Sequence, residues 1–174
     1  EAGDIVSAFQ KTGGAAKIAG ADLNELTAIF TSVRATTRES ADSIATGLRT
    51  IFTRLQRSDT VDALKNMGLN LRYTADEARA LGNINMKDQF VGAYEAIQRL
   101  SQGLAGLRTT DTRFAAVIEE LGGYRQISRV VPAIQEFTTA QKALNVAKTG
   151  ALSLDVAAEQ RQEALATKFT KVKE

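Results

Sequence analysis

The sequence SIATGLRTIFTRLQR, residues 43–57, decides the fold of this chain. Its aliphatic residues recur every three or four positions, at Ile44, Leu48, Ile51 and Leu55, with Phe52 beside them. This spacing predicts a helix from about residue 40 to residue 56 with one continuous apolar stripe. Because a helix cannot bury its own stripe, we expect flanking helices to cover it. Gly47, inside this helix, is predicted to let one of them approach closely.

The composition supports a helical protein and excludes several kinds of chemistry. The 174 residues are 44% hydrophobic and 6% aromatic, with one proline, no cysteine, no histidine and a net charge of +2. The core is therefore expected to consist of Leu, Ile, Val and Ala, a composition typical of helical proteins. The missing residue types remove thiol nucleophiles, imidazole bases and the commonest metal ligands. Because the chain starts at Glu1 and has no signal peptide or membrane-length apolar run, we expect a soluble segment of a longer protein.

Local signals mark the helices of the first half. We expect Asp4 to cap a first helix that Gly13 and Gly14 end. Asp22 and Glu25 have the spacing of a capping box, which predicts a helix from Leu23 to about Thr36.

A shorter helix and an extended segment follow the central stretch. Ser58 and Asp59 are predicted to cap a helix, with Met67 on its inner face, that Gly68 ends. The alternation in residues 69–73 predicts extended chain, and Thr74 with Glu77 predicts a second capping box.

Three further helices are predicted downstream. One runs from Met86 to about Leu100 and carries Phe90 and Tyr94, and another begins at Thr110–Thr112 and ends at Gly122 and Gly123. A third runs from Tyr124 to about Lys148, where Pro132 marks either a kink or a restart at a first turn.

The predicted fold class is all-α, an antiparallel helical array of about seven to eight helices with a C-terminal helical arm. We expect residues 1–150 to form a compact helical module. Residues 151–174 read as the start of an extended or coiled-coil helix, because their sparse apolar stripe lies among many charged side chains.

The sequence disfavours an enzyme. Gly13-Gly14 and Gly122-Gly123 lack the lysine of a phosphate-binding loop, and no serine has a histidine to activate it. Residues 34–57 hold five arginines against two acidic residues, a basic balance that could track phosphates. Phe52 in this segment and Phe30 just before it fall on the apolar stripe, however, so no base-stacking platform is predicted and nucleic-acid binding is disfavoured.

Two stretches resemble phage tail tape measure proteins. The first is Gly47-Leu48-Arg49-Thr50-Ile51-Phe52-Thr53-Arg54-Leu55, which is similar to a recurring signature of that family. The second, Leu121-Gly122-Gly123-Tyr124-Arg125-Gln126, resembles the family's Gly-x-Arg-Gln element at the start of a helix. The resemblance covers about residues 22–147, although the connection from Leu69 to Asn85 lacks the expected Gly-centred turn.

The resemblance implies a structural virion protein that sets tail length during assembly. Such a protein is in the host cytoplasm during assembly and in the tail lumen of the finished virion. It implies tail tube and tail assembly proteins as partners, and self-association, with no small-molecule substrate, cofactor, metal or catalytic residue in this region. We expect Gly47, Phe52, Arg54 and Arg125 to belong to a shared structural core, with the two arginines paired to carboxylates between helices. The alternatives are a generic helical protein-protein interaction domain and a basic helical nucleic-acid-binding domain.

Overall fold

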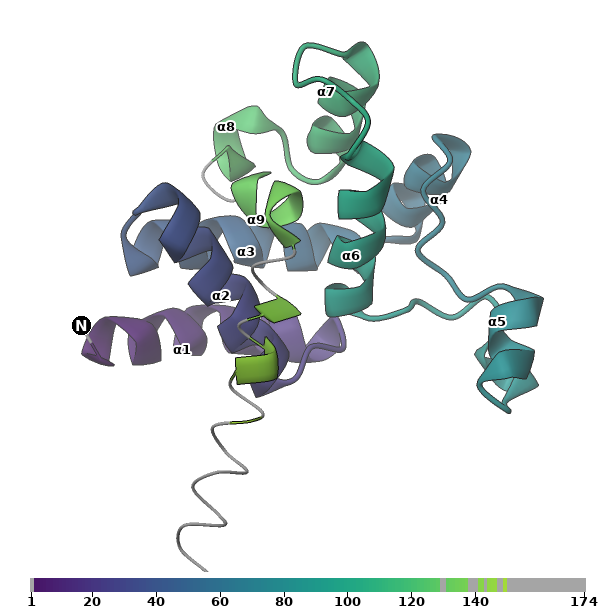
Figure 1. Ribbon diagram of the computed structural model, residues 1–174, viewed down its shortest axis with the longest axis horizontal. Coiled ribbons are helices and arrows are strands. Elements are labelled where there is room, and N and C mark those ends of the chain that lie inside the picture. Colours follow the sequence, from purple (N-terminus) through teal and green to yellow (C-terminus); the bar gives the residue numbers. More distant parts are fainter. Residues whose placement is uncertain (1, 129–130, 138–140, 143, 147–148, 150–174) are drawn as a thin grey trace, which may run out of the picture.

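The computed structural model describes residues 2–128, 131–137, 141–142, 144–146 and 149 (Figure 1). Within these residues the chain forms nine α-helices, one short 3₁₀ helix and no β-strand, which confirms the predicted all-α class. The elements are α1 (Ala2–Ile18), α2 (Leu23–Thr37), α3 (Ala41–Leu55), α4 (Ser58–Asn66), α5 (Ala75–Ala80), η1 (Ile84–Met86), α6 (Ala93–Leu104), α7 (Thr112–Glu120), α8 (Tyr124–Ile127) and α9 (Val131–Gln135). The predicted C-terminal arm, residues 151–174, lies outside the described residues.

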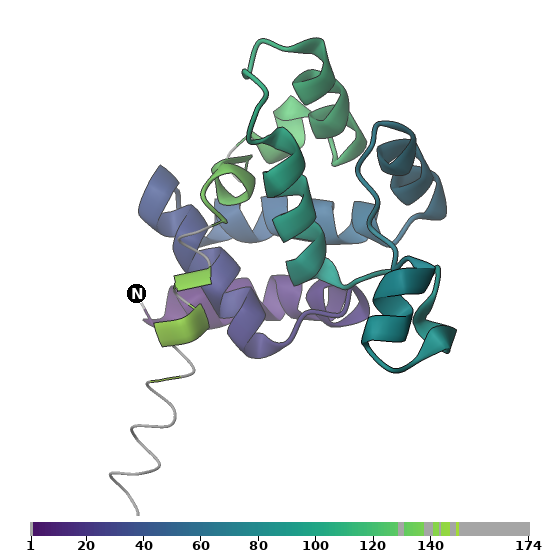
Figure 2. The same cartoon turned by 45° about the vertical axis from the view of Figure 1, so that its right-hand side comes forward.

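Helix α3 is the centre of the molecule, as the opening stretch predicts. Its stripe is buried, with at most 1% of each side chain exposed at Ile44, Leu48, Ile51, Phe52 and Leu55. Neighbouring helices α1, α2, α4 and α8 all contact α3. Figures 1 and 2 show α1 and α3 side by side and running in the same direction, and in Figure 1 α2, which connects them, crosses in front of both.

Helix α1 does not end where the glycines predict. It continues through Gly13 and Gly14 to Ile18, and Asp4 lies inside it rather than at its cap. Each interior glycine costs about 1 kcal/mol of helix stability relative to alanine. Packing of α1 along α3, with Ala8 and Ala16 buried, outweighs that cost.

The capping predictions are partly confirmed. The carboxylate of Asp22 accepts a hydrogen bond of 2.8 Å from the Glu25 amide, and Glu25 Oε1 accepts one of 3.1 Å from the Asp22 amide. At α4 the prediction is wrong, because Ser58 is already helical and Arg57 occupies the cap position without a side-chain hydrogen bond. Met67, predicted to face inward, is 39% exposed because it follows the last helical residue.

Residues 69–73 are extended, as predicted, and they pair with a segment that was predicted to be helical. Arg72 and Phe90 form an isolated antiparallel bridge. The Tyr73 amide donates to Gln89 O at 2.9 Å, and the Val91 amide donates to Leu71 O at 3.0 Å. The helix predicted from Met86 therefore starts only at Ala93, because this pairing holds the intervening residues extended.

Gly92 fixes the start of α6. Its φ is 94°, a left-handed value that favours glycine. The Ala93 amide donates to Ala19 O at 2.8 Å, and a Cβ on Gly92 would lie 3.6 Å from Gly20 O. The start of α6 is therefore seated directly against the α1–α2 turn.

The last described helices follow the predicted order with one additional break. Helix α7 begins after Asp111 and ends before Gly122, as expected. The helix predicted from Tyr124 to Lys148 is divided into α8 and α9, which raises the number of helices above the predicted seven to eight. Pro132 lies in the first turn of α9, which confirms the restart rather than the kink.

Candidate functional site

The first stretch that resembles tape measure proteins lies on α3. Gly47, Leu48 and Phe52 are buried on its inner side, and Arg54 is partly exposed near its end. The buried members form part of the core around which the other helices pack. None of the three carries a group that can act as an acid, base or nucleophile.

The second stretch forms the turn between α7 and α8. Gly122 has a φ of 134°, and a Cβ built on it would lie 2.7 Å from Thr50 Cγ2. Gly123 is buried at the N-terminal cap of α8, and its carbonyl accepts from the Gln126 amide at 3.0 Å. Arg125 lies on α8 with its side chain exposed.

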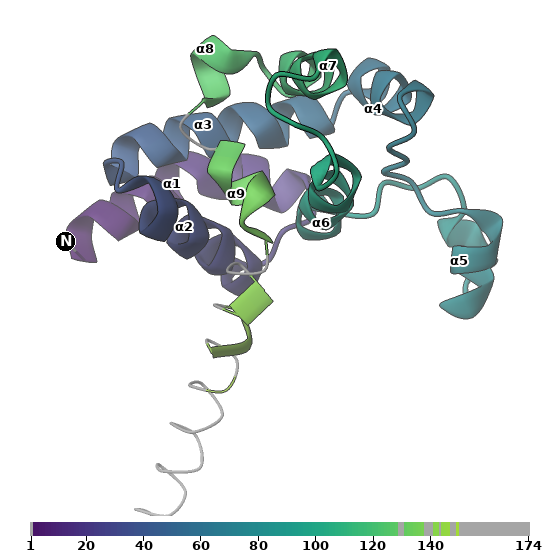
Figure 3. The same ribbon diagram turned by 45° about the horizontal axis from the view of Figure 1, so that its top comes forward.

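The two stretches, far apart in sequence, therefore meet in space. Thr50, inside the first stretch, is the residue against which Gly122 of the second is seated, and α3 contacts α8. Figure 3 shows α8 lying along α3 on the side opposite α2. A side chain at position 122 would collide with the Thr50 methyl group, which would have to shift.

The predicted pairing of Arg54 and Arg125 with carboxylates is wrong for the part of the chain that the structure describes, where neither arginine forms an ion pair. Arg125 is exposed on a four-residue helix, and Arg54 faces outward from the stripe. Sequence spacing could place both arginines on helices, but it could not place a carboxylate opposite them.

The basic segment around α3 has no aromatic platform. Phe30 and Phe52 are 3% and 0% exposed, which confirms that both belong to the core. Arg57, at the end of the segment, is paired with Asp59 at 2.7 Å. The segment therefore lacks the exposed rings on which single-stranded bases stack.

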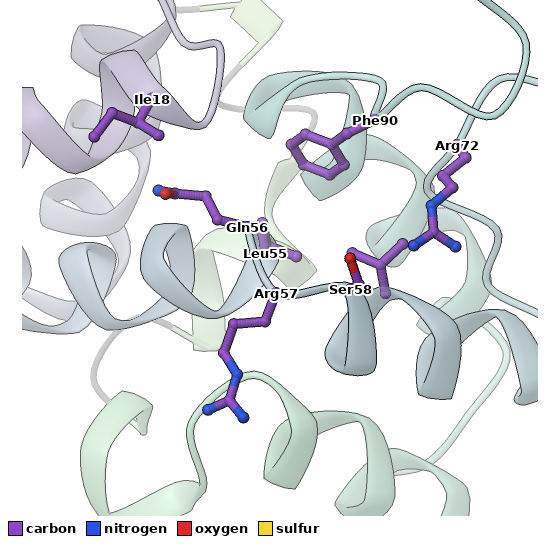
Figure 4. Close-up of a pocket in the computed structure, with 8 residues that line it drawn as sticks. Ile18, Leu55, Gln56, Arg57, Ser58, Arg72 and Phe90 are labelled. Atoms are coloured by element: carbon purple, nitrogen blue, oxygen red, sulfur yellow. The ribbon is translucent and has the colours of Figure 1, made fainter.

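A surface cleft of about 440 Å³ lies between the end of α3 and the paired extended segments (Figure 4). Its apolar walls come from Ile18 at the end of α1, Leu55 of α3, Val61 of α4 and Phe90. Ile18 is 75% exposed, an unusual exposure for an isoleucine, whereas Leu55 and Val61 are buried. Figure 4 shows Ile18 and Phe90 on opposite sides of Leu55.

Polar groups of the cleft are largely neutralised. Arg57 is bonded to Asp59, and Arg72 forms an ion pair with Asp62. The hydrogen bond from Arg57 holds the pKa of Asp59 below its usual range. Gln56 and Ser58 complete the lining, and Figure 4 shows the Arg57 side chain pointing away from Ile18 and Phe90. The chain has no histidine, so Ser58 has no imidazole base, and the described residues contain no cluster of three or more metal-ligating side chains.

A polar centre that sequence reasoning missed surrounds Arg99 of α6. Its side chain is only 18% exposed. Nη1 donates to Asn70 O at 3.1 Å and to Arg72 O at 3.3 Å, and the guanidinium lies 6.0 Å from the centre of the Tyr73 ring. Arg99 thus satisfies two carbonyl groups of the extended segment.

The same guanidinium also binds two carboxylates. Nη2 donates to Glu77 Oε1 at 3.0 Å, and Nε donates to Glu95 Oε1 at 3.2 Å. The other Glu77 oxygen accepts from the Thr74 amide at 2.8 Å, and this bond and Arg99 lower the pKa of Glu77. Only Glu95, four residues before Arg99 on a helix, could have been paired with it from sequence.

Arg99 anchors a projection, residues 74–88, that contains α5 and η1. Its ends are held together by the bonds between residues 71–73 and 88–91. Figures 1 and 3 show α5 standing away from the other helices. Leu81 and Ile84, at the far end of this projection, are 56% and 55% exposed.

Tyr94 carries a buried polar group. Its ring packs against Phe137 with centroids 5.0 Å apart. Its hydroxyl is buried without a hydrogen-bond partner in the part of the chain described, and burial, with a smaller effect of Glu25, raises its pKa. Tyr94 does not line the cleft between Ile18 and Phe90, and we assign its hydroxyl no chemistry.

None of the described helices is long and apolar enough to cross a membrane.

A family described as phage-related minor tail protein matches residues 1–123. This match spans α1 to α7 and therefore includes α3, the cleft and the projection. No solved structure gives a significant match to the chain.

Proposed function

The chain belongs to the phage-related minor tail protein family, and from that premise we propose that it is part of a tape measure protein. Membership makes it a structural component of the phage tail in the virion. The proposal adds that the protein lies in the tail lumen and sets the length of the tail during assembly.

The observation that carries this proposal is the contact between the two stretches that resemble tape measure proteins. Gly47, Leu48 and Phe52 lie in the core around α3, and Gly122 is seated against Thr50 of the same helix. Each signature is weak by itself, but the segments that carry them pack against each other and so form one structural unit. This supports a tape measure protein over an unrelated helical adaptor, in which the two stretches have no reason to meet.

In this proposal, residues 1–150 are a compact module and residues 151–174 continue into an extended helix. A helix advances about 1.5 Å per residue, whereas a bundle of short helices adds little length for the chain it uses. The module therefore serves as an attachment point on a longer ruler. Its partners are tail tube and tail assembly proteins and further copies of itself, and it has no catalytic role, substrate or cofactor.

Tail length is the property that tests this proposal. Insertion of about 28 helix-forming residues, four heptads, into residues 151–174 should lengthen each tail by about 40 Å, at about 1.5 Å per residue. The measurement is the length distribution of tails in negative-stain electron micrographs of phage carrying the altered gene.

The matched control places the same insertion in the turn between Leu104 and Thr112, which is outside the helices of the module. That insertion should leave tail length unchanged, because it adds a loop to a compact body. Equal tail lengths in both variants and in the wild type would refute the ruler and favour the generic helical interaction domain.

A further inference from the structure

The projection, residues 74–88, has few contacts that hold it to the helices around α3. Among the described elements, α5 packs chiefly on η1, which is also in the projection. Ala78 is the one buried residue of the projection. In the described part of the chain, one side-chain hydrogen bond joins the projection to a body helix, from Arg99 Nη2 to Glu77 Oε1 at 3.0 Å.

The backbone hydrogen bonds of α5 are made within the projection itself. The Leu81 amide donates to Glu77 O at 3.0 Å, and the Asn83 amide donates to Ala78 O at 3.0 Å. Isolated helices shorter than about 12–15 residues are marginal in water, and α5 has 6 residues. Because α5 is too short to stay folded without its contacts, the parts of the projection are expected to fold and unfold together.

The chain on either side of the projection is fixed in the core. Leu71 and Val91 are 0% and 8% exposed and belong to the hydrophobic core. The Val91 amide donates to Leu71 O at 3.0 Å. Beyond this bond, the amides of Tyr73 and Asp88 complete the pairing of the two ends. That outer pairing can therefore separate while the inner bond and the core remain in place.

We infer that the projection opens and closes as one unit while the helices around α3 remain folded, with Arg99 as its latch. Opening breaks the bond from Arg99 to Glu77 and the outer pairing at Tyr73, and it keeps the bond between Leu71 and Val91. Segments with few buried apolar contacts open with free energies below that of global unfolding.

The hinge of this movement lies beside the cleft. Arg72 and Phe90, which line the cleft, are the neighbours of Leu71 and Val91 in sequence. Leu55 and Val61, on the opposite wall, belong to α3 and α4. The cleft is therefore the surface nearest to the hinge.

Thiol labelling tests the opening directly, because the chain has no native cysteine. Ala78→Cys places a buried thiol in the projection, and Ala45→Cys places one in α3; both alanines are 0% exposed. N-ethylmaleimide should modify Ala78→Cys at least about 100-fold faster than Ala45→Cys in the absence of denaturant. Its rate should also rise less steeply with urea, because opening exposes less surface than global unfolding.

Equal labelling rates with equal urea dependence would overturn the inference, because the projection would then open only when the whole chain unfolds.

Hydrogen exchange of the unaltered chain tests whether the projection acts as one unit. The amides of Leu81, Asn83 and Asp88 should have protection factors within about threefold of one another and the same dependence on urea. A spread of more than about tenfold among them would mean that α5 frays residue by residue, and it would overturn the single unit. This measurement needs no substitution at Ala78.

The latch is tested by adding Arg99→Met to the Ala78→Cys variant. Labelling should become about tenfold faster or more, since the bond to Glu77 and the bonds to two carbonyl groups are lost. The matched control is Arg79→Met, which removes an exposed ion pair within the projection and should change the rate by less than about twofold. An unchanged rate in Arg99→Met would refute the latch.

Tail length is a separate measurement that does not depend on this movement. The tape measure proposal can therefore fail while the projection opens as inferred, or hold while it does not.

Discussion

Replacing Arg99 with methionine should destabilise the protein by about 2–3 kcal/mol. Methionine keeps an unbranched apolar stem beside Tyr73 but removes every donor. The two carbonyl groups at Asn70 and Arg72 each lose a bond worth about 1 kcal/mol. The carboxylates of Glu77 and Glu95 are about 40% exposed, so each pair adds no more than about 0.5 kcal/mol.

Urea unfolding followed by far-UV circular dichroism measures this change. For a chain of this size, 2–3 kcal/mol corresponds to a fall in Tm of about 5–10 °C. Hydrogen exchange then locates the loss. The amides of Tyr73 and Asp88, which pair the ends of the projection, should exchange faster, while the amides of α3 should not.

The matched control is Arg79→Met on the same projection. Arg79 pairs with Asp76, but the two side chains are 68% and 88% exposed, so the expected loss is below about 0.5 kcal/mol. A free energy of unfolding for Arg99→Met within about 0.5 kcal/mol of the wild type would refute the argument, because four hydrogen bonds would then contribute nothing.

Three further predictions concern other positions. Gly122→Ala should lower the free energy of unfolding by about 1–3 kcal/mol, because Gly122 has a positive φ and lies against Thr50. Thr50→Ser removes the contacting methyl group and should recover part of that loss. An unchanged free energy of unfolding in Gly122→Ala would contradict the close approach. The Thr74 amide is the main cause of the lowered pKa of Glu77, so the ionised carboxylate stabilises the fold above its unfolded pKa, and this contribution disappears as the pH falls through the folded pKa. Glu77→Gln should therefore flatten the acid limb of the curve of unfolding free energy against pH. An unchanged acid limb would contradict this assignment. Tyr94→Phe removes a buried hydroxyl without a partner in the described chain and should leave Tm unchanged or raise it; a clear fall would reveal a bond to the hydroxyl.

Much of the fold follows from local sequence. The stripe of α3 and the capping boxes at Asp22 and Thr74 each involve residues within a few positions of one another. Their geometry is set by the helix itself, so spacing alone predicts it. The resemblance to tape measure proteins likewise placed its second element correctly at the start of a helix, α8.

The failures involve partners that are distant in sequence. Gly13 and Gly14 remain helical because α1 packs on α3, and Phe90 is extended because Arg72 lies beside it. The partners of Arg99 in the projection and the extended segment lie 22 to 29 residues before it. No periodicity in the sequence reports such contacts, so the polar centre and the cleft were visible only in the structure.

The pairing of Tyr73 with Gln89 and Asp88 makes residues 74–88 a closed excursion from the body. Both of its ends leave from one fixed point, so a replacement that keeps the bond of Glu77 to Arg99 leaves the bundle intact, and each doubling of loop length costs only about 0.6 kcal/mol. Residues 74–88 are therefore a segment that can be exchanged. Evolution, or an engineer, can lengthen, shorten or replace it to change what the module contacts while the helices around α3 keep their packing.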